Sequence, residues 1–341
     1  MNALDGSKRA TLRDVARHAK VSVATVSRVL NKSDLVTKET RDRVTQAIEA
    51  LNFVPSAAAR TLNSGNSRTI GALVPTLDHS IFARYLNALE QRLSDHGYAL
   101  IVAITGGVAE VEERKAFGLL DMGVEGLLIS GKTHSAGFDA LVDRFRVPTL
   151  ITSYFDEGAR YPTIGYDNAA IAANAFTYLR SLGHRTIAVI HGPCDVNDRN
   201  TARIDAIKAM DRGGMTTFWP VEMNVSGGAD GVREMAGKGQ LPSAILCLSD
   251  VLALGASFEL QRLGMRVPGD ISIMGFDDLE WSAASVPGMT SIQLPAAEMG
   301  VSASDAMAAW LKTGRRAEPR MLPAEIVVRG STRDIGADGG A

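Results

Sequence analysis

Hydrophobic residues near the N-terminus follow the period of an α-helix. Leu12, Val15, Ala16 and Ala19 stand at i, i+3, i+4 and i+7, and they therefore predict a helix with one apolar face. Thr11 directly precedes this run and has the side chain of an N-cap. The first predicted helix therefore begins after Thr11.

Two more helices are predicted close behind the first. Only Lys20 and Val21 separate the first helix from Ser22, which is the next N-cap. The second helix has Val26, Val29 and Leu30 on its inward face and Val23, Ala24, Ser27 and Arg28 on its outward face. The third helix follows Thr37 and has the inward residues Val44, Ala47, Ile48 and Leu51. This trio predicts a helix-turn-helix, whose second helix fits the DNA major groove.

The outward face of the second helix has the chemistry of a DNA-binding surface. Val23 and Ala24 can contact a thymine methyl group, and Arg28 can bond to a guanine edge or a phosphate. The alternative is a small helical bundle with a solvated basic face. Residues 1–68 contain 12 Lys and Arg but six Asp and Glu, a net charge of +6, whereas the other 273 residues contain 24 and 32, a net charge of −8. This asymmetry favours an anionic partner for the N-terminal part alone.

The motifs in this region resemble a known family. The run DVARHAKVSVATVSRVLN, followed by VTKETRDRVTQAIEALNFVPSAAARTL, resembles the DNA-binding head of the lactose-repressor (LacI) family of bacterial transcription regulators. Lys20 departs from the Gly that is usual in this turn, and a positive φ is therefore expected at Lys20. By resemblance the head comprises residues 1–55. The residues expected to bind DNA are Thr11, Ser22, Val23, Ala24, Thr25, Ser27, Arg28 and Asn31, together with Ser56, Ala59 and Leu62 of the next segment.

A linker at residues 56–67 follows the head. Pro55 stops the third helix, and Ser56 can cap a brief helix, Ala57–Asn63, that is too short to hold alone in water. In the resembling family this hinge helix forms when a dimer binds its operator, and a leucine from each copy wedges into the minor groove. Leu62 is the matching residue here. A flexible tether with a chance leucine is the alternative.

From Arg68 onward, apolar runs recur at the spacing of strand–helix units. The runs begin near Thr69, Tyr98, Gly126 and Val147, and again near Thr186, Met215, Ala244 and Ile271. Each series predicts four parallel strands joined by helices, and the two series predict two doubly wound subdomains that face each other across a cleft. The expected fold class is α/β with an N-terminal helix-turn-helix domain.

The same layout resembles the effector-binding core of the LacI family, which is similar to a periplasmic sugar-binding protein. By this resemblance the chain crosses between subdomains near Gly165, Ser291 and Pro323. The effector-binding domain is expected at 68–334, with an N-subdomain of 68–164 and 292–322 and a C-subdomain of 165–290 and 323–334. Residues 335–341 are expected to form a flexible tail.

Polar residues at strand ends of the C-subdomain are candidates for effector binding. Ser249, Asp250 and Asp277 follow apolar strands, and carboxylates there can accept pairs of sugar hydroxyls. Capping of a helix explains Asp250 equally well. By resemblance, Asp277 and Arg203 occupy effector-binding positions, and Ser249 replaces the usual Asn of the family. A surface ion pair with a neighbouring aspartate is the alternative for Arg203.

Five further residues complete the candidate site. Asp167 can bind the ligand or cap a helix, and capping is the favoured interpretation. Trp281 can stack on a sugar ring or pack in the core. The resembling family also places effector contacts after the first and fourth strands of the N-subdomain, which correspond here to His79, Phe82 and Ser153. A solvated loop position for His79 and a core position for Phe82 stay open.

One motif points to another class of protein. The segment GLLISGKT, Gly126–Thr133, fits the GxxxxGK[ST] pattern of nucleotide-binding loops. The residues between its glycines are themselves an apolar strand, whereas a P-loop follows a strand and is open. A P-loop enzyme is therefore the rival hypothesis, and loss of nucleotide binding on changing Lys132 would support it. A pure sugar-binding module is a third hypothesis.

Composition leaves little room for other classes. Cys194 and Cys247 lie 53 residues apart without a CxxC motif, so neither a disulfide framework nor a zinc site is indicated. No segment reaches the roughly 18 apolar residues of a membrane span. We therefore expect a cytoplasmic homodimeric regulator without metal or cofactor. It would bind operator DNA under control of a sugar or sugar acid, or of a purine corepressor, and it is not expected to be an enzyme.

Overall fold

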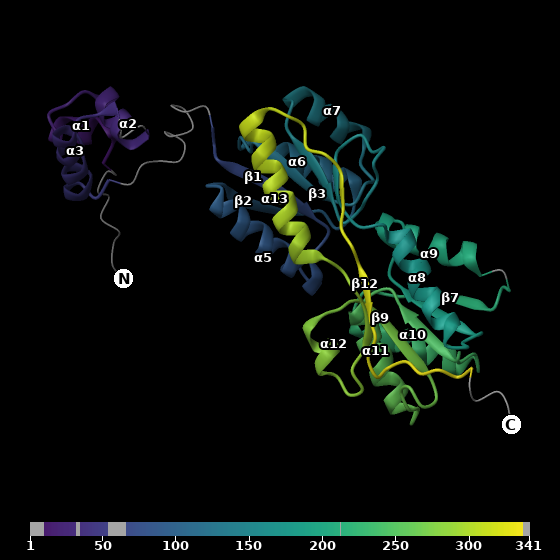
Figure 1. The fold of residues 1–341 in the computed structure, drawn as a ribbon. Coiled ribbons are helices and arrows are strands. Elements are labelled where there is room, and N and C mark those ends of the chain that lie inside the picture. The colour runs from purple at the N-terminus through teal and green to yellow at the C-terminus, as the bar shows by residue number, and fades with distance from the viewer. Residues whose placement is uncertain (1–9, 32–34, 54–65, 212, 337–341) are drawn as a thin grey trace, which may run out of the picture. The chain divides into compact units, whose positions relative to one another are not determined.

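The computed structural model describes residues 10–31, 35–53, 66–211 and 213–336, which form two compact units, 1–67 and 68–341 (Figure 1). The first unit contains α1 (Leu12–His18), α2 (Val23–Asn31) and α3 (Lys38–Ala50). Val15, Val26 and Val44 are fully buried, one on each helix. Burying each of these side chains contributes about 1.5–3 kcal/mol to stability. The three helices predicted from the sequence are confirmed.

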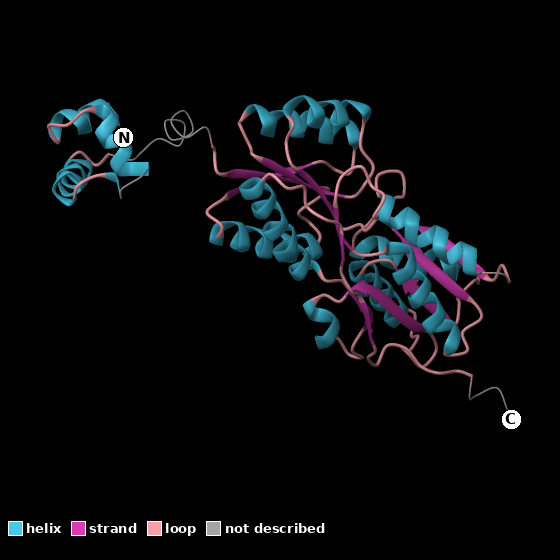
Figure 2. Ribbon diagram, turned by 45° about the horizontal axis from the view of Figure 1, so that its top comes forward, coloured by secondary structure: helices cyan, strands magenta, loops and turns pink. Residues whose placement is uncertain are grey.

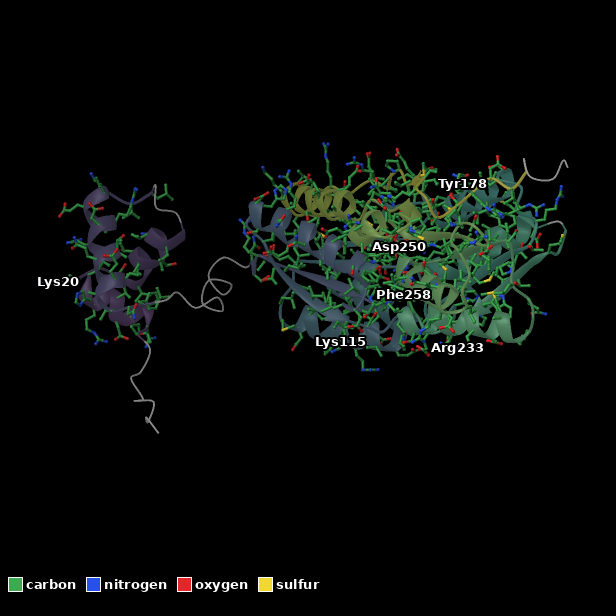
Figure 3. All side chains as sticks on the ribbon, turned by 90° about the horizontal axis from the view of Figure 1, so that it is seen from below. Lys20, Lys115, Tyr178, Arg233, Asp250 and Phe258 are labelled. Atoms are coloured by element: carbon green, nitrogen blue, oxygen red, sulfur yellow. The ribbon has the colours of Figure 1, made fainter. Side chains whose placement is uncertain are left out.

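The turn between α1 and α2 explains how Lys20 replaces glycine. The amide of Val21 donates to the carbonyl of Ala16 over 3.0 Å, and the amide of Lys20 donates to that of Arg17 over 3.3 Å. These are the two hydrogen bonds of a Schellman cap, which requires a left-handed residue after the C-cap. Lys20 has a φ of 54° and lies on the surface of the head (Figure 3). The expected positive φ is confirmed, and it costs about 1 kcal/mol relative to glycine.

The second unit contains two six-stranded sheets. The first has the order β11-β5-β4-β3-β1-β2 and defines the N-subdomain, and the second has the order β12-β10-β9-β8-β6-β7 and defines the C-subdomain. The strands of the first sheet are β1 (Thr69–Val74), β2 (Ala99–Ile104), β3 (Gly126–Ser130), β4 (Thr149–Thr152), β5 (Thr163–Gly165) and β11 (Arg320–Met321). Those of the second are β6 (Ile187–His191), β7 (Thr216–Pro220), β8 (Ala244–Cys247), β9 (Ser272–Asp277), β10 (Thr290–Gln293) and β12 (Glu325–Val327). All neighbouring pairs are parallel except β10 with β12.

Helices flank the strands of both sheets (Figure 2). The N-subdomain includes α5 (Ser80–Asp95), α6 (Ala109–Asp121), α7 (Ala136–Phe145) and α13 (Ala296–Thr313). The C-subdomain includes α8 (Asn168–Ser181), α9 (Asp198–Met210), α10 (Val225–Gly237), α11 (Asp250–Arg262) and α12 (Glu280–Ala284). No helix among the residues that the structure describes is long and apolar enough to cross a membrane.

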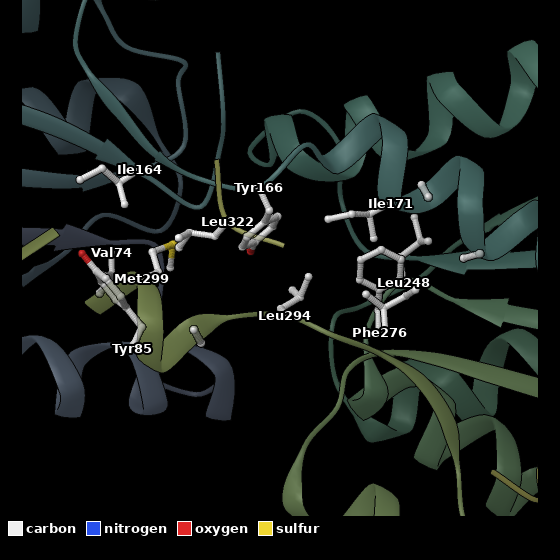
Figure 4. Packing of buried hydrophobic residues seen from close by; sticks show 14 of the residues in the cluster. Val74, Tyr85, Ile164, Tyr166, Ile171, Leu248, Phe276, Leu294, Met299 and Leu322 are labelled. Carbon is white, nitrogen blue, oxygen red and sulfur yellow. The ribbon is translucent and has the colours of Figure 1, made fainter. Parts of the chain in front are cut away.

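The chain passes between the subdomains three times. It leaves the first sheet after β5, enters α13 after β10, and passes from β11 to β12. Ile292 and Gln293 still pair with β9 and β12, so the second crossing lies after Gln293 rather than at the expected Ser291. The largest cluster of buried hydrophobic residues extends across these crossings (Figure 4). It joins Val74 of the N-subdomain to Phe276 of the C-subdomain.

Candidate functional site

The main candidate site is a cavity of about 640 Å³ between the two subdomains. Segments that follow the carboxyl ends of strands in both sheets line it, as expected for facing doubly wound sheets. Six residues named from the sequence line this interlobe cavity: His79, Phe82, Ser153, Arg203, Ser249 and Asp277. The structure therefore brings together residues that are up to 198 positions apart.

Arg203 lies deep in the wall of the cavity rather than on the surface. Its side chain extends from α9, and the residue is only 6% exposed. Nε donates to Asn168 Oδ1 over 3.0 Å, Nη1 donates to the carbonyl of Leu248 over 3.2 Å, and the guanidinium stacks 4.1 Å from the centre of the Phe276 ring. Burial lowers the pKa of Arg203, but an arginine stays charged. Among the described residues no carboxylate forms an ion pair with it, so the surface ion pair is wrong.

Asp277 is the acidic counterpart of Arg203 in the same cavity. It ends β9, is 7% exposed and accepts a hydrogen bond of 2.9 Å from Ser249 Oγ at Oδ2. Burial raises the pKa of Asp277, and the nearby negative charge of Asp250 raises it further. Its φ of 117° lies in a region that non-glycine residues rarely adopt. The surrounding fold therefore holds a strained and poorly solvated carboxyl group at the cavity.

This environment predicts that Asp277→Asn stabilises the fold at neutral and basic pH. An ionised buried carboxylate whose native pKa is raised destabilises the fold above the unfolded pKa, so an isosteric amide stabilises it by about 1–2 kcal/mol at pH 8. Asparagine also tolerates positive φ. The gain should vanish as the pH falls below the ordinary carboxyl pKa, because both states are then protonated. Thermal unfolding from about pH 3 to pH 8 measures this change. The exposed Asp195→Asn serves as the control, and an equal or larger gain at pH 4 would contradict the account.

Three of the predicted effector-binding residues lie elsewhere. Asp250, labelled in Figure 3, is fully buried. Its carboxylate accepts hydrogen bonds from the amide of Leu279 and the hydroxyls of Ser282 and Ser291. A Cβ at Gly275 would lie 2.1 Å from Asp250 Oδ1, so glycine makes room for this carboxylate. Asp250 therefore anchors the segment after β9 and does not line the cavity.

The other two also have structural contacts. Asp167 is exposed and caps α8, where it accepts a hydrogen bond of 3.0 Å from the amide of Ala170. Trp281 on α12 packs against the apolar core of the C-subdomain. Neither residue lines the cavity. The cap predicted at Asp167 is therefore confirmed, and of the two alternatives for Trp281 the structure shows core packing.

The N-subdomain closes the cavity from the other side. His79 Nε2 lies 3.0 Å from the carbonyl oxygen of Met223, so this contact crosses between the subdomains. Ser153 follows β4 with a φ of 64°, and its Oγ accepts a hydrogen bond from Ser130 Oγ. The Phe82 ring stacks 6.4 Å from that of His79. An aromatic ring and two polar groups thus face Arg203 and Asp277 across the cavity.

Several residues that line the cavity were not named from the sequence. Arg199 and Asn200 are buried on α9 beside Arg203, and Tyr166 follows β5. Arg199 stands four residues before Arg203, so a helix over these residues places both side chains on one face. That spacing was a usable signal. No comparable signal marked Tyr166, because it adjoins a strand of three residues.

The GKT segment forms a contact between the subdomains. Gly126–Ser130 is the strand β3, and the amides of Lys132 and Thr133 donate to Asp198 Oδ2 over 2.5 and 3.0 Å. Arg199 Nη1 donates to the other oxygen of Asp198 over 3.1 Å. The amides that would face a phosphate in a P-loop therefore bind a carboxylate of the opposite subdomain. We call this contact between Asp198 and residues 131–133 the interlobe clasp.

The head presents a second candidate surface on α2. Val23, Ala24 and Arg28 are exposed on one side of this helix, while Val26 is buried on the other. Ser22 caps the helix by accepting a 3.1 Å hydrogen bond from the amide of Thr25, and the Ser22 and Thr25 hydroxyls lie 2.9 Å apart. Thr11 caps α1 through Asp14. Ser27 also belongs to α2, and Asn31 is its last residue. The predicted contacts Ser56, Ala59 and Leu62 lie outside the described residues.

Comparison with known proteins adds independent evidence. Residues 11–56 match the family described as "Bacterial regulatory proteins, lacI family", and residues 176–332 match "Periplasmic binding protein-like domain". The HTH-type transcriptional repressor CytR of Escherichia coli (strain K12) is 29% identical over 342 residues, which cover 98% of this chain and 100% of CytR.

Two solved structures are also similar over nearly the whole chain. The lac repressor dimer bound to operator and the anti-inducer ONPF has a TM-score of 0.86 at 26% identity, covering 96% of this chain and 100% of that one. A complex of the transcriptional regulator CelR with cellobiose has a TM-score of 0.66 at 25% identity, covering 95% and 100%. The arrangement of a helix-turn-helix and two facing sheets is thus shared with transcription regulators.

Proposed function

This chain belongs to the lacI family of bacterial regulatory proteins, and from that premise we propose that it represses transcription under control of a small molecule in the interlobe cavity. CytR is a transcriptional repressor, so we propose a regulatory and not a catalytic role for this chain. A repressor acts where the chromosome lies, and we therefore propose a cytoplasmic location. The proposed parts are a DNA-binding domain at 1–55, a hinge at 56–67 and an effector-binding domain at 68–334.

The proposed DNA contacts lie on the exposed side of α2. Thr25, Ser27 and Arg28 would read bases or phosphates, with Leu62 of the hinge as a minor-groove wedge. The similar lac repressor structure is a dimer on its operator, so we propose that this chain also binds DNA as a homodimer. Two copies related by a twofold axis read a near-palindromic operator with half-sites one or more helical turns apart.

The proposed effector is a sugar or a sugar acid. The observation that carries this proposal is that Arg203 and Asp277 line the same cavity. The guanidinium of Arg203 offers buried donors and the carboxyl of Asp277 a buried acceptor, and the two groups form no ion pair with each other. Ring hydroxyls can donate to Asp277 and accept from Arg203 at once. The complex of CelR with cellobiose supports a sugar as the effector of this chain. A purine corepressor is the second candidate, because the Phe82 ring at the cavity could stack on a base.

Regulation would follow from a preference of the effector for one arrangement of the subdomains. A ligand held by both subdomains favours the closed arrangement and shifts the population toward it. Because the hinges of a dimer can fold on DNA only at one spacing, the same shift changes the affinity for the operator. The interlobe clasp is part of the closed arrangement and shares Arg199 with the cavity wall.

Replacing Asp198 tests the role of the clasp in closure. Asp198→Asn puts an amide group where Lys132, Thr133 and Arg199 now donate to a carboxylate. The loss of charge-assisted hydrogen bonds costs about 1.5–3 kcal/mol and should shift the population toward the open arrangement. Small-angle X-ray scattering of the full-length protein should show a larger radius of gyration than for the wild type. Asp195→Asn is the matched control, and equal radii for all three proteins would show that the clasp does not hold the subdomains together.

The proposed function is tested by a search for the effector. Duplexes selected from a random library supply the operator, and sugars, sugar acids and purines are then screened for a change in the affinity of the protein for that duplex. Release by a sugar or sugar acid is the expected result. Stronger DNA binding with a purine would replace the first candidate by the second.

A further inference from the structure

The side of α9 that faces the interlobe cavity carries three hydrogen-bond donors. Arg199, Asn200 and Arg203 are all buried, and all three line the cavity. Arg199 donates to Asp198, and Arg203 donates to Asn168 and to the carbonyl of Leu248. The third donor, Asn200 Nδ2, is buried without any hydrogen-bond partner among the described residues. Its residue is 1% exposed, so bulk water does not solvate the amide.

Gly192 and Met223 pack beside this amide at the wall of the cavity. A Cβ placed on Gly192 would lie 3.5 Å from Asn200 Nδ2 and 2.5 Å from Met223 Cε. A side chain at position 192 would therefore collide with Met223 and crowd the amide. Met223 and Asn200 both line the cavity, and the carbonyl of Met223 contacts His79 of the opposite subdomain. The unpartnered amide thus lies in the part of the wall that the two subdomains close together.

A buried donor without a partner is unfavourable in the empty protein. Arg203 and Asp277 already have protein partners, so their hydrogen bonds contribute to the fold as well as to any binding. Asn200 Nδ2 gains a partner only if another molecule supplies an acceptor. Its backbone amide separately donates to Asn197 Oδ1 of the N-cap and does not depend on the side chain. Nδ2 of Asn200 therefore contributes no hydrogen bond to the part of the fold that the structure describes.

We propose that Asn200 is a specificity-determining residue of the effector site and that Nδ2 donates to an oxygen of the bound effector. The acceptor is a hydroxyl, ring or carboxylate oxygen on the C-subdomain side of the cavity. This inference rests on the proposed function, since it takes the interlobe cavity to be the effector site. It predicts that the protein discriminates against an analogue that lacks this one oxygen, because the amide would then stay unpaired.

The test compares Asn200→Ala and Asn200→Asp with the wild type in the full-length protein. D-ribose, D-glucose, D-gluconate, cellobiose and adenine are titrated by calorimetry, followed by deoxy analogues of any sugar that binds. We expect both variants to weaken binding roughly 10- to 100-fold. The wild type should bind one deoxy analogue more weakly than the parent sugar, and Asn200→Ala should bind the two alike. Asn174→Ala, at an exposed position of α8, is the control.

Thermal unfolding separates this role from a structural one. Because Nδ2 has no protein partner, Asn200→Ala loses packing contacts but no hydrogen bond of Nδ2, and its melting temperature should fall by no more than about 5 °C. A fall of more than about 5 °C would overturn the inference, since it would reveal a structural partner. Equal affinity of the wild type and both variants for a compound that binds would also overturn it, while the proposed function would stand. If no compound bound the wild type, the proposed effector class would fail, and the melting temperature would still decide whether the amide is unpartnered.

Discussion

Arg28→Ala is expected to weaken operator binding by at least roughly 30-fold while leaving the head folded. Arg28 is exposed on α2, on the same side as Val23 and Ala24, and it contributes nothing to the buried face around Val26. A bidentate contact from arginine to guanine contributes about 1–3 kcal/mol to base discrimination. A homodimer places two such residues on the operator, so the expected loss is about 2–6 kcal/mol, roughly 30-fold to more than 10,000-fold.

The control for this variant removes the same charge from another face of the head. Arg43 is exposed on α3, and Arg43→Ala lowers the net charge of the head by the same amount. Fluorescence anisotropy should be measured with the selected operator and with a scrambled duplex of equal length. Arg28→Ala should lose affinity mainly for the operator, whereas Arg43→Ala should change both affinities slightly and similarly. Equal losses for the two variants on both duplexes would mean that Arg28 provides charge and not recognition.

Arg203→Met is expected to abolish the response to the effector without abolishing DNA binding. Removing one buried, hydrogen-bonded charge at a binding site costs about 3 kcal/mol. This cost raises the dissociation constant of the effector roughly 100-fold or more. The effect has a second component, because the positive charge of Arg203 now opposes the raised pKa of Asp277. Without that charge the Asp277 carboxyl is more often protonated and accepts fewer hydroxyl donors.

The structural cost of Arg203→Met must be measured beside its effect on binding. The substitution leaves Asn168 Oδ1 and the carbonyl of Leu248 without the donor that they now have, so the melting temperature should fall by a few degrees. Arg203→Lys keeps the positive charge but loses the planar guanidinium with its several donors, and it should bind the effector with intermediate affinity. Arg185→Met, at an exposed position of the C-subdomain, is the control. A normal effector response in folded Arg203→Met would contradict the assigned position of the effector.

Much of the fold was predictable because buried parallel strands read as continuous apolar runs. TIGALV and AILC are apolar strands buried over nearly their whole length, and their bounds followed from the pattern alone. The strands that were missed are short or polar. β5, β11 and β12 contain two or three residues, which is too short for a pattern to appear, and β10 (TSIQ) has only one apolar residue among four. They lie next to the crossings, which explains why the crossing at Ser291 was placed too early.

The candidate site was predictable in part, for a different reason. Ser249 follows β8 after one intervening residue and Asp277 ends β9, so their place at the edge of the sheet followed from the chain order. Asp250 comes one residue later, at the start of α11, where its side chain turns away from the cavity into a buried network. Asn200 was missed because a polar residue on a helix is expected to face solvent, and no sequence pattern shows that α9 buries it.

The central claim is that this chain binds a specific duplex and releases it, or holds it more tightly, when a small molecule fills the interlobe cavity. The most direct measurement is the anisotropy of a labelled, selected duplex titrated with the full-length protein, over a range of salt concentrations and with and without the effector found by screening. The account predicts that log affinity falls steeply and linearly with log salt concentration and that the selected duplex is bound more tightly than the scrambled one. It also predicts that the effector shifts the binding curve of the wild type but not that of Arg203→Met. Equal affinity for both duplexes at every salt concentration, or a shift that persists in Arg203→Met, would contradict it.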